Sequence, residues 1–542
     1  MNFGTASPSR GSGAVLRGSL LCGAAILAAS VLLGACSTMD TIRGHNGETG
    51  KSELARLQVQ AAGVSPVAQR PILMGKAGLP ERAKRQKKTW PLSAGGGVSL
   101  VPHIPLFSKG VSMISTLVRD PILRPVSSAK RLVFLSRHVV DELVVPSPLP
   151  TRAAGELPPL ASGPGMDLAE FEGFLDRETG GRASYGKVEF LIDGEAYFNA
   201  LNQAVGSAES SIKVRTYIFD NDDVAVRFAD LLKERSGDAK VKVLYDRLGS
   251  LVAGGTDSET LPASFKKPKS IKRYLKRNSK VRVRRNANPW LTSDHTKTII
   301  IDRKTAFLGG MNIGREYRYD WHDLMVEVTG PVVGELDRDF AKAWRRAGPM
   351  GDLGSVFGKK IKSTPGARPE GARLRILRTK PGSAEIYRAT MEAIRRAKSY
   401  IYIENAYMTD NRLLRALAAA RQRGVDVRVI FPAQNDSPIL KASNVVTANA
   451  LHQAGVRVYL YPGMSHVKAM AVDGWAIFGS ANMDWLSLKL NRELNLASSD
   501  KDTVDALLER LFEAVFEVSL EMTKPMPAGP LKRLAELLAN QL

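Results

Sequence analysis

Two short segments of this sequence share one pattern of chemically capable residues. Each holds a histidine, a lysine two positions later and an aspartate five positions after the lysine, in the pattern H-x-K-x4-D. They are His295, Lys297 and Asp302 in the first segment and His466, Lys468 and Asp473 in the second. With seven histidines in the chain, two such matches with similar downstream turns arise by chance on the order of one time in a thousand.

The spacing favours chemistry on an anion. Residues i and i+2 of an extended strand point to the same face, so we expect His295 beside Lys297 and His466 beside Lys468. A neighbouring ammonium group lowers the proton affinity of an imidazole and attracts anions. Two such segments brought together would surround a phosphodiester with two imidazoles and two ammonium groups.

Each segment leads to a glycine-rich turn that ends in asparagine, at Asn312 and Asn482. These amides would donate hydrogen bonds to charge that develops on the phosphoryl oxygens. One histidine would attack phosphorus and the other would protonate the departing oxygen, which combines covalent with general acid catalysis. Asp302 and Asp473 complete the catalytic motif. We interpret them as structural hydrogen-bond acceptors more than proton carriers, because turn-like sequences follow them.

The elements that must position these residues form a repeat that begins near residue 186. In each copy a helical pattern precedes a buried strand, and another helix and two more strands lead to the motif. The expected helices cover residues 200–208 and 389–397. The expected strands cover residues 211–219, 241–245 and 281–283, then 400–408, 425–431 and 456–458. This alternation predicts α/β units on a largely parallel or mixed sheet.

The double motif with its glycine-rich turns resembles the phospholipase D superfamily over about residues 186–525. Several segments are similar to its bacterial cardiolipin synthase branch: residues 309–317, 321–323, 327–331 and 482–484, with Ser487, Asn491 and Glu493. The resemblance implies two repeated phospholipase D-type α/β sandwich domains with the active site at their interface. One chain would suffice, without an obligate protein partner.

The same resemblance implies roles for the site residues. A phosphohistidine would form on His295, and His466 would act as general acid and then as base for the incoming alcohol or water. An acid from the other copy would orient each histidine, so His295 would pair with Glu493 and His466 with Asp323. A carboxylate on the far ring nitrogen would fix the tautomer and stabilise the imidazolium.

Three neighbouring positions qualify this interpretation. Ser480 in the second turn is grouped with Asn312, Asn482, Asp323 and Glu493, as residues that contact the phosphate or support those that do. Met311 stands in the first turn where relatives commonly carry Ser or Thr, which puts one polar contact to the phosphate in doubt. His322, next to Asp323, is not expected to be catalytic, and a contact to the substrate is the weaker alternative.

No metal and no cofactor are expected. The sequence has no H-E-x-x-H, and the acidic run 220–223 lacks the glycine and the distal glutamate of a calcium loop. A P-loop is absent as well, which argues against nucleotide-driven chemistry.

Composition narrows the class of protein. The chain has 542 residues, 44% of them hydrophobic, and a net charge of +23. These values exclude a mostly disordered or collagenous chain, and two cysteines exclude a disulfide scaffold. The positive charge favours a polyanionic partner, either nucleic acid or anionic lipid headgroups.

The N-terminus reads as a bacterial export signal. Residues 1–35 combine early arginines with an apolar run, and residues 33–36 resemble the lipobox of lipoproteins, in which Cys36 is lipidated. Ser37 favours the outer membrane, so we expect a lipid-anchored protein of the cell envelope that faces the periplasm. The alternative is a plain signal peptide or a membrane anchor helix.

The expected boundaries follow from these features. Residues 36–165 would form a basic N-terminal region and linker, and residues 349–373 would connect a first domain at 166–348 to a second at 374–525. A C-terminal helix would follow at 526–542. The amphipathic stretches 504–516 and 531–542 could dock on a bilayer or pack on the core.

Several functions share such a site. A phospholipid is the expected substrate, because a lipid-anchored envelope enzyme sits beside an anionic phospholipid membrane and meets little nucleic acid. Phosphatidyl transfer, which would make cardiolipin from phosphatidylglycerol, and hydrolysis by a phospholipase D both remain open. A nuclease is the weaker alternative, and a lipid-binding module without activity is disfavoured because both histidines, lysines and asparagines are present.

Overall fold

A computed structural model of the chain describes residues 157–180, 183–247, 249–250, 257–286, 293–349, 351, 371–436 and 438–527. The chain divides into two compact units, Met1–Lys76 and Ala77–Leu542, and every described residue belongs to the second. The expected signal peptide, Cys36, nearly all of the basic region 36–165, most of the connection 349–373 and the C-terminal stretch 531–542 lie outside the described residues.

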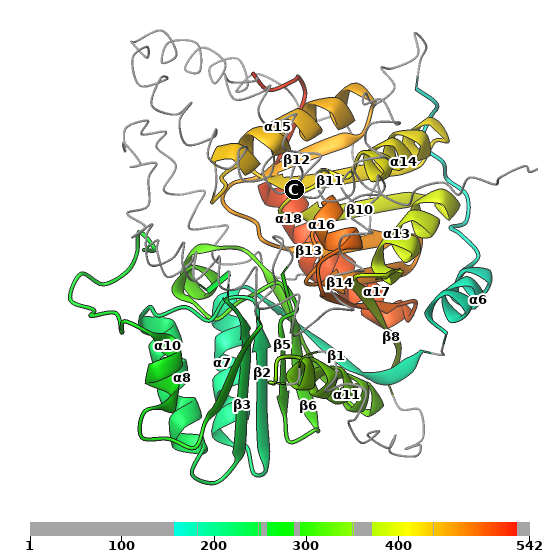
Figure 1. The fold of residues 1–542 in the computed structure, drawn as a ribbon. Helices are drawn as coiled ribbons and strands as arrows, with labels where there is room; N and C mark the ends of the chain where they lie inside the picture. Colours follow the sequence, from blue (N-terminus) through cyan, green and yellow to red (C-terminus); the bar gives the residue numbers. More distant parts are fainter. Residues whose placement is uncertain are drawn as a thin grey trace, which may run out of the picture. The chain divides into compact units, whose positions relative to one another are not determined.

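The described residues form two halves that repeat one strand order within a continuous 16-stranded sheet. Reading outward from the centre, the first half runs β1-β7-β6-β5-β2-β3-β4 and the second runs β8-β15-β14-β13-β10-β11-β12, with β16 at its edge. The halves join where β1 (Ser184–Ile192) pairs antiparallel with β8 (Ala372–Lys380). Figure 1 shows the first half mainly in green and the second in yellow to red.

The remaining strands of the first half are β2 (Ser211–Thr216), β3 (Lys240–Asp246), β4 (Arg282–Asn286), β5 (Thr298–Ile301), β6 (Thr305–Gly309) and β7 (Leu324–Thr329). Those of the second are β9 (Ser383–Ala384), β10 (Tyr400–Asn405), β11 (Asp426–Pro432), β12 (Arg457–Tyr461), β13 (Lys468–Val472), β14 (Trp475–Gly479), β15 (Glu493–Ser498) and β16 (Leu520–Glu521). Strands β2, β3 and β4 pair in parallel, as do β10, β11 and β12. The other pairings are antiparallel, so the sheet is mixed and the predicted α/β class is confirmed.

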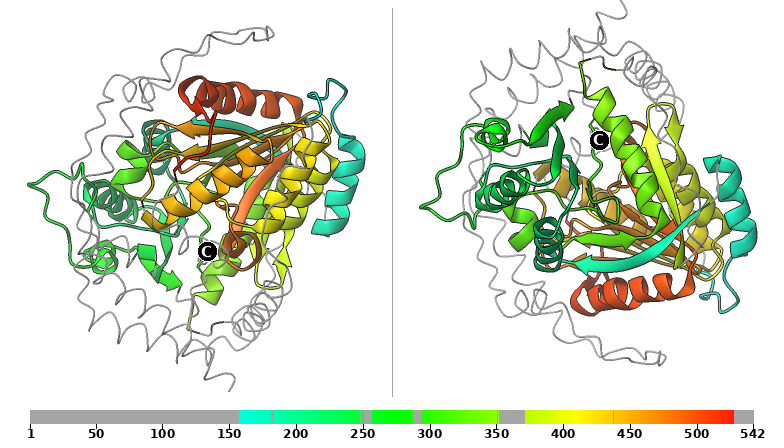
Figure 2. Two further views of the ribbon diagram at one scale, coloured as in Figure 1. Left: turned by 90° about the horizontal axis from the view of Figure 1, so that it is seen from above. Right: turned by 90° about the horizontal axis from the view of Figure 1, so that it is seen from below.

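Helices cover both faces of each half. The first half carries α7 (Gly194–Gly206), α8 (Asp223–Arg235), α10 (Ile271–Lys276), the π-helical turn η2 (Glu316–Asp320) and α11 (Pro331–Arg346). The second carries α13 (Glu385–Arg396), α14 (Asn411–Gln422), α15 (Pro438–Gln453), α16 (Trp485–Lys489), α17 (Lys501–Leu507), η3 (Leu508–Glu513) and α18 (Ala514–Val518), with α6 (Leu168–Thr179) packed alongside. In Figure 2, α17 to α18 (red) lie on one side of the strands of the second half and the yellow helices lie on the other.

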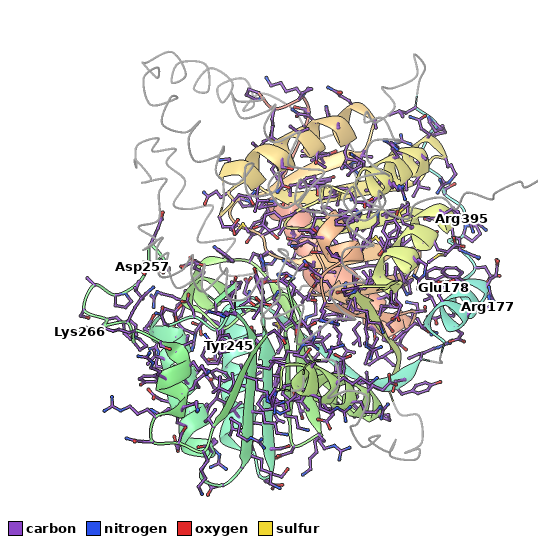
Figure 3. All side chains as sticks on the ribbon, viewed as in Figure 1. Arg177, Glu178, Tyr245, Asp257, Lys266 and Arg395 are labelled. Atoms are coloured by element: carbon purple, nitrogen blue, oxygen red, sulfur yellow. The ribbon has the colours of Figure 1, made fainter. Side chains whose placement is uncertain are left out.

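Three large hydrophobic clusters fill the layers between the sheet and the helices. Figure 3 shows the side chains of the described residues as sticks on the ribbon. One cluster belongs to each half, and the third runs across both, where Phe190 of β1 meets Phe478 of β14 edge to face at 5.2 Å between ring centroids. Val504, Leu507 and Leu511 are buried in this shared cluster. The stretch 504–516 therefore packs on the core, which decides against the bilayer alternative for these residues.

Two strands are shorter than predicted, for a local reason. Strand β2 ends at Thr216 because the side-chain oxygen of Asn312 accepts a hydrogen bond from the backbone N–H of Ile218 at 2.9 Å. In the second half Asn405 Oδ1 takes the N–H of Tyr407 in the same way, at 3.2 Å. Side chains thus replace the ladder partners of both strands at the edge of the sheet where the motifs lie. Among the described residues, no helix is long and apolar enough to cross a membrane.

Candidate active site

Each histidine motif is held in place by the opposite half of the chain. The backbone N–H of His295 donates to the carbonyl of Arg492 at 2.9 Å, and that of His466 donates to the carbonyl of His322 at 2.6 Å. The histidines lie just before β5 and β13, so the expectation that they lie within strands was wrong. The chain there forms a single bridge to the other half instead of a regular ladder.

The ring of His295 contacts Glu493 of the second half. Nδ1 of His295 lies 3.1 Å from Oε2 of Glu493 and 3.0 Å from the carbonyl oxygen of Ser480. The hydroxyl of Ser480 donates to the same carboxylate oxygen at 2.6 Å and accepts from the N–H of Leu494 at 3.0 Å. Ser480 therefore supports Glu493, which is one of the two roles expected for its group of residues.

The ring of His466 contacts Asp323 of the first half. Nδ1 of His466 lies 2.6 Å from Oδ2 of Asp323, and the N–H of Leu324 donates to Oδ1 of the same carboxylate at 2.8 Å. A side chain at Gly310 would collide with this carboxylate. Gly310 is the counterpart of Ser480 in the second half. The second half therefore combines Glu493 with Ser480, and the first half combines the shorter Asp323 with the smaller Gly310.

Both pairs expected from the resemblance are thus in contact, and both use Nδ1. A carboxylate that accepts from the Nδ1–H leaves Nε2 as the ring atom available for phosphorus or for a proton. All four side chains are buried, with 0% of the Glu493 and Asp323 side chains exposed. Burial raises the pKa of both carboxyl groups and lowers the pKa of both imidazoles.

The two lysines lie in the same buried environment. Lys297 Nζ donates to the carbonyl of His295 at 2.8 Å, and Lys468 Nζ donates to that of His466 at 2.5 Å. Burial lowers the pKa of Lys468 to about 8, against the attraction of Asp323 and Glu493. The pKa of Lys297 is also lowered by burial. Both lysines lower the pKa of each histidine, so the two motifs share one electrostatic environment. A phosphate anion bound here would stabilise the charged form of both lysines.

The two asparagines are not equivalent. Oδ1 of Asn312 accepts hydrogen bonds from the backbone N–H of Ile218 at 2.9 Å and from Thr216 Oγ1 at 3.2 Å. Its NH₂ group is therefore free to donate, and one of its two hydrogen bonds goes to Tyr317. Asn482 is hydrogen-bonded to Asp484. Each NH₂ group carries two hydrogens, so each amide keeps a donor for an oxyanion.

Asp302 and Asp473 lie away from this site, which corrects their place in the catalytic set. Asp302 is five residues along the extended chain from Lys297, a separation of roughly 16 Å. Its carboxylate accepts from the backbone N–H groups of residues 209–211. Asp473 accepts in the same way from Met166 and residues 398–400. Both tie the end of a strand to a neighbouring loop, as the structural interpretation expected.

Three aromatic residues that sequence reasoning missed surround the histidines. The ring of Tyr217 lies 4.8 Å from that of His295, and Lys297 Nζ lies 5.3 Å from its centroid. Trp321 and Tyr317 lie 5.4 and 5.5 Å from the ring of His466. All three belong to the first half and pack against the two histidine rings. Their positions directly after β2 and just before Asp323 were the only available signal.

Comparisons with known proteins agree with this geometry. The family model described as "Cardiolipin synthase, PLD-like domain" matches residues 201–344 and 390–516. Cardiolipin synthase A of Pseudomonas putida (strain W619) is 31% identical over 376 residues, which cover 65% of this chain and 72% of that protein. Cardiolipin synthase A of Pseudomonas fluorescens (strain SBW25) is 32% identical over 362 residues, covering 62% of this chain and 71% of that protein.

A solved structure shares the fold. Phosphatidylserine synthase of Haemophilus influenzae Rd KW20 aligns with a TM-score of 0.53 at 12% identity and covers 68% of this chain and 97% of its own. The family match over both halves and the relatives above 30% identity agree with the paired histidine motifs. The chain therefore belongs to the phospholipase D superfamily and is a phosphatidyltransferase of its cardiolipin synthase-like group.

Proposed function

We propose that this enzyme transfers the phosphatidyl group of one phosphatidylglycerol to a headgroup hydroxyl of a second, which forms cardiolipin and releases glycerol. The observation that carries the proposal is the exchange of carboxylates between the halves, Glu493 to His295 and Asp323 to His466. It fixes both rings with Nε2 available, beside two lysines that have lost part of their proton affinity to burial. The similarity to cardiolipin synthases supports the choice of substrate.

The reaction would run in two displacements. Nε2 of His295 attacks phosphorus, the bond from phosphorus to the glycerol oxygen breaks, and His466 gives its Nε2 proton to that oxygen. The phosphatidyl group is then held on His295. The hydroxyl of the second phosphatidylglycerol loses its proton to His466 and attacks phosphorus, and the phosphorus–nitrogen bond breaks. The two lysines and the asparagine amides would stabilise the charge on the phosphoryl oxygens in both steps.

The test is incubation of the full chain with labelled phosphatidylglycerol vesicles and separation of the products. Cardiolipin with an equal amount of glycerol is the expected result. Phosphatidic acid without cardiolipin would mean that water is the acceptor and that the enzyme is a phospholipase D. Absence of lipid turnover together with cleavage of DNA would favour the nuclease alternative and overturn the proposal.

We also propose that the enzyme engages an anionic phospholipid membrane through one face of its first half. Lys213 of β2, Lys242 of β3 and Arg282 of β4 lie directly opposite one another on three parallel strands. Like charges opposite each other across strands are destabilising. Lys213 pairs with Asp337 of α11, which also attracts Lys242. Lys242 Nζ lies 5.5 Å from the ring centroid of Trp344, and within the described residues no acid lies at ion-pair distance from Lys242 or Arg282.

This row lies next to the open edge of the sheet, since β4 is the last strand on that side. Together with burial, the neighbouring cations Lys213, Arg282 and Arg284 lower the pKa of Lys242. An anionic surface would relieve this repulsion, and each basic residue near such a surface contributes about 1 kcal/mol. Because the proposed substrate is a phospholipid, we expect anionic phospholipid headgroups to be the anions that bind this row.

Vesicle flotation tests the basic face. The full chain with Cys36→Ala, which lacks the candidate acylation site, should float with phosphatidylglycerol vesicles and less with phosphatidylcholine vesicles. Lys242→Glu with Arg282→Glu should reduce that binding at least tenfold. The same charge reversal at Lys501, whose side chain is 84% exposed on the second half, is the control. Equal losses in both variants, or no loss, would contradict the assignment.

The location in the cell is a proposal from the sequence alone. We propose that residues 1–35 are removed, that Cys36 is acylated, and that the enzyme is anchored in the outer membrane and faces the periplasm. Several acyl chains would hold it firmly, because one chain alone gives only marginal binding. Mass spectrometry of the mature N-terminus tests this: an unmodified Cys36 or an intact residue 1 would contradict it.

A further inference from the structure

His322 lies behind the His466 side of the site and is held by two carboxylates. Its side chain is 0% exposed, and Nδ1 lies 2.7 Å from Oδ1 of Asp193. Nε2 lies 3.6 Å from Oε1 of Glu404, a distance that marks an ion pair more than a hydrogen bond. A carboxylate at each ring nitrogen suits a doubly protonated imidazole, because only the imidazolium donates from both.

The main chain of the same residue supports the general acid. The carbonyl of His322 accepts from the N–H of His466 at 2.6 Å, and the N–H of His322 donates to the carbonyl of Met464 at 3.0 Å. The N–H of Asp193 donates to the carbonyl of Asp323 at 2.9 Å. His322 and its partner Asp193 therefore fix both members of the pair formed by Asp323 and His466.

The second carboxylate reaches the same motif from another strand. Oε1 of Glu404, in β10, accepts from the hydroxyl of Ser465 at 2.6 Å, and Ser465 directly precedes His466. The ring of His322 stacks on that of Tyr461, at the end of β12, with 4.8 Å between centroids and 20° between planes. Asp193, Glu404 of β10 and Tyr461 of β12 thus converge on one buried ring.

A charged ring offsets the carboxylates on either side of it, and burial raises the pKa of Glu404, which His322 and Lys468 oppose. Glu404 has 0% of its side chain exposed and Asp193 has 17%. Buried carboxylates are costly unless they are paired. Burial opposes the charge on His322, but Asp193 and Glu404, and Asp323 to a lesser degree, raise the pKa of His322 to about 9. The other charged neighbour is Lys468, which attracts both Glu404 and Asp323.

The backbone of Asp193 is strained at this point. Its φ is +68°, a left-handed value that is uncommon for a residue other than glycine. Such conformations persist where the surroundings determine them, and they gather at functional sites. The bonds to His322 and Asp323 are the surroundings that hold Asp193 in this conformation.

The first motif has the same backbone arrangement, but Arg492 stands there in place of a second histidine. Arg492, which precedes Glu493, gives its carbonyl to the N–H of His295 at 2.9 Å, as His322 does for His466. The place of Glu404 is taken by Arg215, which pairs with Asp294, the residue before His295, at 2.6 Å. Among the described residues, the buried imidazole between two acids therefore belongs to the His466 side alone.

We propose that His322 is a positioning residue for the general acid: as an imidazolium between Asp193 and Glu404, it fixes Asp323 and the main chain at His466 and keeps the Asp323 carboxylate ionised. The proposal rests on the proposed function for the role of His466. The structural part, a charged buried imidazole, stands independently of any activity.

Removal of this charge has a predictable sign. Burial already raises the pKa of Asp323 to about 7, and His322 is among the groups that oppose the rise. Without the imidazolium, Asp323 loses one of the cations that oppose the effect of burial, and only Lys468 and Lys297 remain, so its pKa rises further. The carboxylate then takes up a proton at a higher pH and no longer orients His466. The acidic limb of the pH profile of kcat should move to higher pH.

The first experiment compares His322→Gln with the wild type in the full chain, using phosphatidylglycerol vesicles from pH 5 to 9. We expect the acidic limb of kcat to move up by about one pH unit and kcat at pH 7 to fall about 10–100-fold, as for outer partners of metal-bound histidines, with KM within about twofold. His452→Gln, the same change in the last turn of α15, is the control. An unmoved limb, or a loss explained by the unfolded fraction, would overturn the proposal.

The second experiment needs no turnover. Histidine-selective ¹⁵N NMR of the wild-type chain at pH 8 should show one imidazole with both ring nitrogens protonated, and this signal should be missing in His322→Gln. A neutral His322 ring at pH 8 would overturn the proposal even if transfer activity is found. If the ring is charged and the wild type forms no cardiolipin, the failure lies with the proposed function.

Discussion

Oδ2 of Asp323 lies 2.6 Å from Nδ1 of His466, although the two residues come from opposite halves of the chain and are 143 positions apart. The converse contact joins His295 to Glu493. Neither half holds a complete pair, since each supplies a histidine to one and a carboxylate to the other. The fold therefore makes the site only when both halves are folded and joined along β1 and β8.

The first prediction concerns Asp323→Asn. The amide keeps the shape of the side chain but cannot stabilise the His466 imidazolium, so kcat should fall about 10²–10⁴-fold, the usual worth of a positioned acid–base group. Steady-state kinetics on phosphatidylglycerol vesicles measures the loss. Asp238→Asn, at a side chain that is 71% exposed, should keep full activity. A loss below fivefold would count against the pairing as a functional one.

The second prediction separates the roles of the two histidines. With a phosphatidyl ester of p-nitrophenol, departure of the leaving group needs no protonation. His466→Ala should therefore still release nitrophenol in a first turnover, whereas His295→Ala should release none, because no phosphohistidine can form. Rapid-mixing absorbance measures the burst. The opposite result would exchange the nucleophile and the general acid.

The third prediction is steric. Gly310→Ala places a methyl group against the Asp323 carboxylate, which must move away from His466. We expect kcat to fall at least tenfold, since a displacement of about 1 Å at a positioned group costs about 10²-fold. Gly206→Ala is the matched control, because a Cβ there meets nothing within 4 Å. Unchanged kcat in Gly310→Ala would show that the carboxylate has room to adjust.

Sequence reasoning reached the fold and the centre of the site for a definable reason. The alternation of apolar strands and helices is local, and the H-x-K-x4-D pattern occurs in both copies, so the repeat was visible without any contact information. The pairs of His295 with Glu493 and His466 with Asp323 came from the resemblance and not from spacing. Nothing local links residues that are 198 positions apart.

The parts that were missed depend on long-range packing. His322 was set aside because its neighbour Asp323 carried the expected role, and its partner Asp193 is 129 residues away in the sequence. The histidines were expected within strands, but the bridges to Arg492 and His322 hold them just before β5 and β13. For Ser480 the sequence left open whether it contacts the phosphate or supports another residue, and only the fold directs its hydroxyl to Glu493.

The fourth prediction tests Asp302 as a structural residue. Its carboxylate accepts from three backbone N–H groups, which lower its pKa to about 2 although partial burial opposes this. Asp302→Asn should lower the free energy of unfolding by about 1.5–3 kcal/mol and leave KM unchanged. The lowered pKa means that this stability is fully present above about pH 4 and is lost as the pH falls through about 2.

Urea unfolding at pH 7 and at pH 3 measures this contribution of Asp302, and the difference between wild type and variant should shrink at the lower pH. A variant of normal stability with impaired kcat would return Asp302 to the catalytic set.

The fifth prediction concerns proton uptake on binding of an anion. In the free enzyme the pKa of Lys468 is about 8 because of burial, so at pH 8.5 much of this amine is neutral. A bound phosphate raises its pKa, and the amine takes up a proton. The contribution of Lys468 to the affinity for inorganic phosphate should therefore be nearly constant below about pH 8 and should fall as the pH rises above it. Titration calorimetry in two buffers of different ionisation enthalpy measures the uptake directly.

In Lys468→Gln the uptake at pH 8.5 should be smaller by the share of Lys468, and the remainder belongs to the other buried groups of the site, Lys297 among them. If the uptake at pH 8.5 is the same in Lys468→Gln as in the wild type, Lys468 is already charged in the free enzyme. The prediction that Lys468 takes up a proton when an anion binds would then be wrong.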